Sequence, residues 1–119
     1  MKMQRFWDDT AKEGTWAGYY DSAVDVDFRS YNFFTRREAV VRLLEKDGVF
    51  GRILDVGCGT GDYAEIAAQH QGSFWGIDYA PEMVRQASER IPGHGSHNLF
   101  VCGSGAELPY REDTFDLVM

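Results

Sequence analysis

Three glycines and two acids lie close together near the middle of this chain of 119 residues. Asp55 precedes Gly57, Gly59 and Gly61, and Asp62 follows them directly. Glycine allows the backbone to turn tightly and to approach a ligand without a Cβ in the way. A glycine-rich turn between a strand and a helix commonly binds a nucleotide-type ligand at the carboxyl end of a parallel strand. The stretch therefore predicts a binding crevice of that type.

The residues on either side of the glycines predict the strand and the helix that such a turn requires. The apolar run at 53–56 is typical of a strand that is covered on both faces. Asp62 is a good N-cap residue, and Glu65 completes a capping-box pattern three positions later. We therefore expect a helix over 63–71.

Charge favours one class of ligand for this crevice. A pyrophosphate binds at a helix N-terminus because free N–H groups and the helix dipole attract an anion there. Asp55 and Asp62 would repel it, whereas they suit a phosphate-free ligand with an ammonium and a sulfonium group, such as S-adenosylmethionine. The relaxed dinucleotide pattern G-x-G-x-x-A is also present at Gly59, Gly61 and Ala64, so a nicotinamide-dependent oxidoreductase stays open as an alternative.

Two sequence blocks, the glycine stretch itself and one further along the chain, support S-adenosylmethionine as the ligand. Asp-Val-Gly-Cys-Gly-Thr-Gly at 55–61 resembles the first motif of class I S-adenosylmethionine-dependent methyltransferases, of the small-molecule type found in ubiquinone and menaquinone biosynthesis. Gly-Ile-Asp-Tyr-Ala-Pro-Glu-Met at 76–83 resembles the second motif and the helix that follows it. The resemblance covers 52–119 well and 1–51 loosely. It implies S-adenosyl-L-methionine as the cofactor and a small-molecule methyl acceptor.

Asp78 lies 21 residues after Gly57, the distance at which a βαβ unit returns the next strand end beside the first turn. We expect its carboxylate to accept hydrogen bonds from both ribose hydroxyls of the cofactor. Tyr79 follows and is a candidate to lie against the adenine face. The resemblance also implies that Asp55 positions the methionine end, while Gly57 and Gly59 let the backbone close on the cofactor.

The third block departs from the family pattern. Related methyltransferases usually have Gly-Asp-Ala after the third strand, whereas this chain has Ser104 at the Asp position and Gly105 at the Ala position. The resemblance implies that Ser104, Gly105 and Ala106 frame the adenine, although a neutral serine is a weaker acceptor than a carboxylate. Cys58, inside the glycine turn, completes the predicted cofactor-binding set. No residue qualifies as a general base, so the catalytic residues are not predicted.

The N-terminal part is rich in aromatic residues and is expected to be separate from the cofactor-binding core. A helix is predicted around 6–13, and a capping box at 35–38 predicts a second helix that ends before Gly48. The resemblance to methyltransferases implies that this segment folds over the cofactor, with Tyr19 and Tyr20 as candidates for the lid; padding of the core is the alternative role for the aromatics. Residues 1–48 would form this cap segment and residues 49–119 the core.

The fold predicted for the core is α/β and Rossmann-like. Strands at 53–56, 73–78, 98–102 and 113–119 would form a parallel sheet in the order 3-2-1-4, with helices on both faces and right-handed crossovers. Class I methyltransferases continue beyond a fourth strand, so we expect this chain to supply the cofactor-binding half. An exposed fourth strand would favour self-association. A catalytically inactive cofactor-binding fragment is the second alternative.

Composition excludes several other functions. The chain has 12 basic and 19 acidic residues and a net charge of −7, which argues against nucleic-acid binding. No stretch is long enough for a membrane span and no signal peptide is recognised, so a cytoplasmic location is expected. Cys58 and Cys102 are expected as free thiols, because their strands are separated by another strand. His94 and His97 lie in a Gly/Ser loop without further ligands, so no metal is expected.

Overall fold

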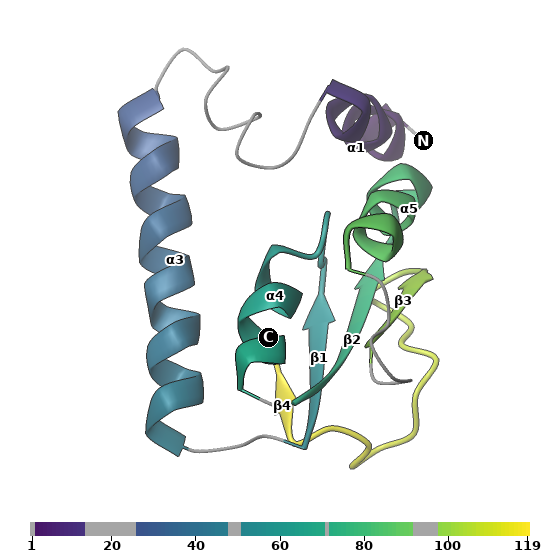
Figure 1. Ribbon diagram of the computed structural model, residues 1–119. Helices are drawn as coiled ribbons and strands as arrows, with labels where there is room; N and C mark the ends of the chain where they lie inside the picture. Colours follow the sequence, from purple (N-terminus) through teal and green to yellow (C-terminus); the bar gives the residue numbers. More distant parts are fainter. Residues whose placement is uncertain (1, 14–25, 48–50, 71, 92–97) are drawn as a thin grey trace.

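The computed structural model describes residues 2–13, 26–47, 51–70, 72–91 and 98–119, and Figure 1 shows how their helices and strands are arranged. In chain order the elements are α1 (Lys2–Glu13), α3 (Val26–Asp47), β1 (Arg52–Val56), α4 (Asp62–Gln69), β2 (Ser73–Asp78), α5 (Pro81–Arg90), β3 (Asn98–Cys102) and β4 (Leu117–Val118). Strands and helices alternate from β1 to β3, which is the pattern of an α/β fold.

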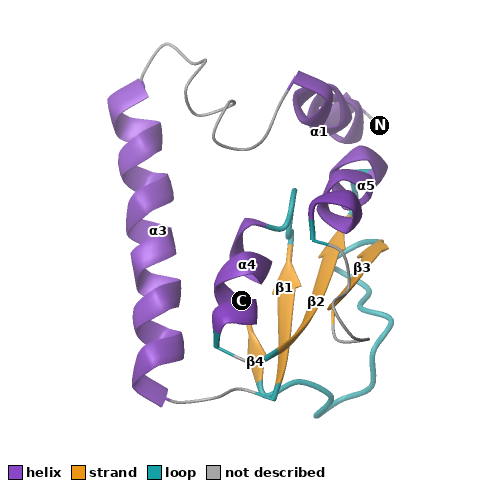
Figure 2. Ribbon diagram, viewed as in Figure 1, coloured by secondary structure: helices purple, strands orange, loops and turns teal. Residues whose placement is uncertain are grey.

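The four strands form one parallel sheet in the order β3-β2-β1-β4 (Figure 2). β1 pairs with β2 over its whole length, from Arg52 to Val56. At the other side of β2, Asp78 lies opposite Cys102 of β3. The carboxyl ends of the strands therefore meet at the same edge of the sheet. The predicted fold class and the strand order 3-2-1-4 are confirmed.

Helices α4 and α5 cover the same face of the sheet. Ile53, Phe74 and Phe100, from three neighbouring strands, are buried on this face. The apolar residues that the α4 and α5 segments add to the same core are Ala64, Ile66, Ala67, Ala87 and Ile91. The chain steps from β1 to β2 to β3 in one direction across the sheet. Two right-handed crossovers in the same direction must place both helices on one face.

The opposite face is covered in part by the segment 103–116 and not by a helix. Leu54, Trp75 and Leu99 lie side by side on this face in the strand register. The ring of Phe115 meets the edge of Trp75 at a centroid distance of 5.4 Å, whereas Leu99 is 52% exposed. The described residues thus differ from the prediction of helices on both faces, because the return from β3 to β4 crosses this face as an irregular segment.

Helices α1 and α3 extend the single helix layer at its two sides (Figure 1). α3 contacts α4, and its Leu44 is almost fully buried in the main core. α1 contacts α5, and its Ala11 forms a smaller buried cluster with Ala80 and Met83. The N-terminal helix predicted around 6–13 is thus present, and it packs directly on the element that follows β2.

α3 is longer than the predicted helix, since it begins at Val26 and not at Thr35. A capping box starts a helix only where the preceding backbone is not already helical. No glycine or proline lies between 26 and 34, so nothing in that stretch stops the helix. α3 has 22 residues, yet none of the described helices is both long and apolar enough to cross a membrane.

β4 is shorter than the predicted strand over 113–119. Asp113 has a φ of 55°, which lies in the left-handed region and interrupts an extended strand. Asp116 then joins the segment to β1, because its side chain accepts a hydrogen bond of 2.7 Å from the Arg52 N–H. Regular pairing begins only where Leu117 lies opposite Ile53.

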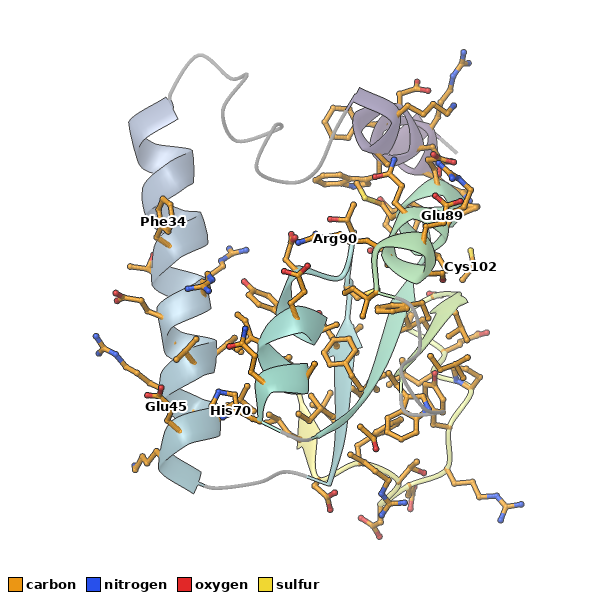
Figure 3. All side chains as sticks on the ribbon, viewed as in Figure 1. Phe34, Glu45, His70, Glu89, Arg90 and Cys102 are labelled. Carbon is orange, nitrogen blue, oxygen red and sulfur yellow. The ribbon has the colours of Figure 1, made fainter. Side chains whose placement is uncertain are left out.

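The two cysteines are free, as predicted. Cys58 is buried, whereas Cys102, labelled in Figure 3, is exposed at the end of β3. β2 separates β1, which precedes Cys58, from β3, which ends at Cys102.

We expect Gly76→Ala to destabilise the fold by about 1–3 kcal/mol through overpacking. A Cβ at this position in β2 would lie 2.6 Å from the Phe100 ring and 2.8 Å from the Cys58 sulfur. Urea unfolding measures the change, with Ser88→Ala on the exposed side of α5 as a control that stays within about 0.5 kcal/mol of the wild type. Equal stability of the two variants would contradict this packing.

Candidate functional site

The glycine turn after β1 is held against the end of β2 by its own N–H groups. Gly57, Gly59 and Gly61 all have left-handed backbone conformations, with φ of 80°, 53° and 80°. The N–H groups of Gly57 and Cys58 donate to the Ile77 carbonyl at 2.8 and 3.2 Å. The N–H of Gly59 donates to Asp78 Oδ2 at 2.9 Å. Three successive donors of the turn are therefore used within the protein.

Asp78 is the side chain that joins the two loops of the site. Its Oδ1 accepts a hydrogen bond of 2.9 Å from the Ala80 N–H, while Oδ2 receives that of Gly59. The residue is only 9% exposed. The structure thus brings Asp78 beside the first turn, as the spacing from Gly57 predicts. Each carboxylate oxygen keeps a second lone pair for a ligand hydroxyl.

A cavity of about 170 Å³ opens over these groups. Its lining residues are Trp7, Gly57, Gly59, Asp78, Tyr79 and Met83. A Cβ at Gly57 would meet no atom within 4 Å, so the backbone there faces open space. The lining therefore combines backbone and a carboxylate with two aromatic rings and a thioether. This combination suits a ligand with hydroxyl groups at one end and a flat apolar ring at the other.

Sequence reasoning missed two of these lining residues. Met83 was assigned to the apolar face of its helix, and Trp7 was counted only among the N-terminal aromatics. Trp7 comes from α1 and lines the cavity together with Tyr79. No motif marks either residue, because both reach the site through the packing of α1 on α5.

Asp55 lies in β1, directly before the turn, and is buried among other acids. It is 4% exposed, and its Oδ2 has no hydrogen-bond partner in the part of the chain that the structure describes. Burial, the charge of Asp78 and the charge of Asp62 raise the pKa of Asp55 to about 7. Burial also raises the pKa of the Cys58 thiol, with Asp55 and Asp78 adding to the effect. The raised pKa favours the neutral thiol, which is a weaker nucleophile than the thiolate.

Asp62 does not cap α4, which corrects the predicted capping box. Gly61 is the N-cap residue, no side chain caps the helix, and α4 ends at Gln69 instead of residue 71. The Asp62 carboxylate pairs instead with Arg90 at the end of α5. Arg90 also reaches Glu65 at 3.1 Å, and Figure 3 shows it between the two helices. The charge of Asp62 is thus compensated, so the electrostatic argument for the ligand rests on Asp55 and Asp78.

The turn at Ser104, Gly105 and Ala106 is exposed and lies over the carboxyl ends of β1 and β2. Ser104 Oγ accepts a hydrogen bond of 3.1 Å from the Ala106 N–H. A Cβ at Gly105 would lie 2.7 Å from a methyl group of Val56, so the turn passes close to β1. These three residues do not line the cavity described above.

The remaining sequence candidates have no described environment. Tyr19, Tyr20, His94 and His97 lie outside the described residues. Within the described ranges, no group of three or more His, Cys, Asp or Glu side chains could hold a metal ion.

Comparison with known proteins places this architecture in a family. The sequence model described as "Methyltransferase domain" matches residues 53–119, more than half of the chain. The chain belongs to the methyltransferase domain family. The matched part of this methyltransferase domain runs from β1 to the end of the chain and contains the glycine turn and Asp78. The resemblance drawn from the sequence motifs is confirmed.

Individual relatives are similar over different lengths. The chain is 30% identical to aklanonic acid methyltransferase DauC of Streptomyces sp. (strain C5) over 116 residues, which cover 94% of this chain and 53% of that protein. It is 30% identical to demethylmenaquinone methyltransferase of Geobacillus stearothermophilus over 71 residues, which cover 56% of this chain and 30% of that protein. The chain thus spans about half the length, or less, of these relatives.

A solved structure shares the fold of this methyltransferase domain. Magnesium protoporphyrin IX methyltransferase (ChlM) from Synechocystis PCC 6803, with bound SAM, aligns at a TM-score of 0.65 and 25% identity. The alignment covers 82% of this chain and 47% of that chain.

We expect Asp55→Asn to remove a pH dependence of stability. The pKa of Asp55 is about 7 in the folded protein and 3.8 without the fold, so the folded state binds this proton more tightly. The contribution to the free energy of unfolding is full below pH 4 and is lost as the pH rises through 7, by roughly 4 kcal/mol. The variant should therefore gain stability relative to the wild type across that window.

Urea unfolding at a series of pH values between about 4 and 8 measures this difference. Glu112→Gln, at an exposed position, is the control, and its difference in stability from the wild type should change little over the same pH range. A difference between Asp55→Asn and the wild type that is constant with pH would contradict the assignment.

Proposed function

We propose that this chain binds S-adenosyl-L-methionine in the cavity beside the glycine turn and serves as the cofactor-binding part of a methyltransferase for a small molecule. The observation that carries the proposal is the arrangement of Asp78. Its carboxylate is held from behind by the N–H groups of Gly59 and Ala80 at the cavity wall. The turn donors that a pyrophosphate would need are used by Ile77 and Asp78.

Each site residue is assigned a role in this proposal. Asp78 would accept hydrogen bonds from the ribose hydroxyls, and Tyr79 would lie against the adenine ring. Gly57 and Gly59 would let the backbone approach the cofactor, with Cys58 as the buried support between them. Asp55 would face the cationic methionine end from below the turn. This division of polar and apolar contacts matches the mixed lining of the cavity.

The exposed turn after β3 completes the proposed site. Ser104, Gly105 and Ala106 would frame the adenine edge, since the Gly103 N–H bonds to the Asp78 carbonyl at 2.9 Å and keeps this turn beside β2. Ser104 Oγ already accepts the Ala106 N–H. A hydroxyl that shares its lone pairs is a weaker acceptor for the adenine amine than a carboxylate would be.

Methyl transfer needs little covalent chemistry from the protein. When bound, the cofactor would supply a methyl group on a positively charged sulfonium, which is electrophilic toward a lone pair of the acceptor. The chain's own residues would hold the donor in line for this attack and keep its orientation. No side chain is assigned as a general base.

The class of acceptor and the assembly are proposed from indirect support. The names of two relatives, aklanonic acid methyltransferase and demethylmenaquinone methyltransferase, support a small organic acceptor. β4 is an outer strand of the described sheet, and because an outer strand can pair with a strand of another copy, we include self-association through β4 in the proposal. We further propose a cytoplasmic location and a division into a cap segment (1–48) and a core (49–119).

Calorimetric titration tests the proposed ligand. We expect S-adenosylmethionine and S-adenosylhomocysteine each to bind one site per chain and NADH to give no heat of binding at the same concentrations. The reason is that the turn presents carboxylates and already bonded N–H groups where a pyrophosphate would lie. Tight binding of NADH with no binding of the sulfonium compound would overturn the proposal in favour of an oxidoreductase.

Asp78→Asn tests the proposed ribose contact. We expect roughly tenfold or weaker binding of S-adenosylhomocysteine, because hydrogen bonds from hydroxyls to a charged acceptor are lost. Asn keeps one oxygen acceptor for Gly59 or Ala80, and urea unfolding shows how much of the fold is retained. Asp113→Asn, away from the cavity, is the matched control. Unchanged affinity in a folded Asp78→Asn protein would refute the assigned role.

A further inference from the structure

Helix α1 is attached to the start of α5 by a cap that comes from outside α5. α5 begins after Ala80, which has no side chain that could cap the helix, so its first N–H groups lack the usual local acceptor. Asp8 of α1 supplies one, since its Oδ1 accepts a hydrogen bond of 3.0 Å from the Glu82 N–H. A carboxylate at this position also interacts favourably with the helix dipole.

Three further contacts hold α1 in the same place. Gln4 Nε2 donates to the Tyr79 carbonyl at 3.0 Å, and Gln86 Nε2 donates to the Ala11 carbonyl. Between these polar contacts, Ala11, Ala80 and Met83 form a buried cluster with Trp7 packed against it. The contacts of α1 therefore concentrate on the segment from Tyr79 to Gln86.

That segment is also one wall of the cavity. Tyr79 and Met83 line it, and Trp7 of α1 lines it as well while packing against the cluster that contains Met83. Trp7 can contact a molecule in the cavity only while α1 is docked on α5. A ligand that touches both Asp78 and Trp7 would bridge the sheet edge and α1.

We propose that α1 is a clasp for the cofactor, in which Trp7 is a binding residue for the adenosine part and Asp8 is a positioning residue that keeps Trp7 in place. The inference rests on the proposed function and extends it to the N-terminal helix. Docking of α1 and occupancy of the cavity stabilise each other, and thermodynamic linkage requires the coupling to be equal in both directions. The lid role predicted for Tyr19 and Tyr20, which lie outside the described residues, stays a prediction.

The first test compares the affinity of variants for S-adenosylhomocysteine by calorimetry. We expect Asp8→Ala to bind about fivefold more weakly, the effect of one lost cap on the docked state. Trp7→Ala should bind roughly tenfold more weakly, as loss of an aromatic stacking partner does for a base. Asp8→Asn should restore most of the affinity because asparagine caps a helix as well as aspartate. Asp9→Ala, the exposed neighbour on α1, is the matched control and should bind like the wild type.

The second test measures amide hydrogen exchange in the wild-type protein with and without S-adenosylhomocysteine. The ligand should slow exchange over residues 4–11, and this protection should be smaller in Asp8→Ala and unchanged in Asp9→Ala. The comparison of free and bound wild-type protein needs no variant, so this test remains valid even where a variant folds poorly.

Two outcomes would overturn the inference, and only the second would also overturn the proposed function. In the first outcome, the wild-type protein binds the ligand without any slowing of exchange over 4–11, and Trp7→Ala and Asp8→Ala bind it with unchanged affinity. This outcome would exclude the clasp and leave the proposed function standing. In the second outcome, neither the wild-type nor the Asp9→Ala protein binds S-adenosylhomocysteine or S-adenosylmethionine. This outcome would exclude both the proposed function and the clasp.

Discussion

The site depends on one carboxylate that holds two loops together. Asp78 accepts N–H groups from Gly59, in the turn after β1, and from Ala80, at the start of α5. Both loops would otherwise leave buried backbone donors unpaired, which costs free energy in a low-dielectric surrounding. Because each oxygen of the carboxylate is used once by the protein, its orientation is set before any ligand arrives. A preorganised acceptor of this kind loses little entropy on binding.

The one-sided helix layer follows from the handedness of the crossovers and determines how α1 reaches the site. α4 and α5 lie on the same face, and the N-terminus of α5 comes to the carboxyl edge of the sheet beside the cavity. α5 begins without a local cap, and Asp8 of α1 compensates for this. The uncapped N-terminus of α5 is thus the point where α1 docks, and this docking places Trp7 at the cavity.

The electrostatic character of the site differs from a simple ring of acids. Arg90 ties Asp62 and Glu65 to the end of α5. Asp55 is buried, and burial together with the charges of Asp78 and Asp62 raises its pKa to about 7. Its carboxyl group therefore titrates near neutral pH. A cationic ligand close to Asp55 would favour the charged form and so be coupled to release of that proton. The site is therefore acidic where a pyrophosphate would need it to be basic.

The sequence by itself determined the parallel sheet, its strand order, the glycine turn and the meeting of Asp78 with Gly59, because strand periodicity and the length of a βαβ unit depend on local spacing. It also indicated the methyltransferase family from three short blocks. Tertiary structure alone decided the rest. The pairing of Asp62 with Arg90 overrode a local capping box, the chain returned from β3 to β4 across the second face of the sheet without a helix, and the docking of α1 brought Trp7 to the cavity. These outcomes depend on residues far apart in the chain, whose contact no local pattern records.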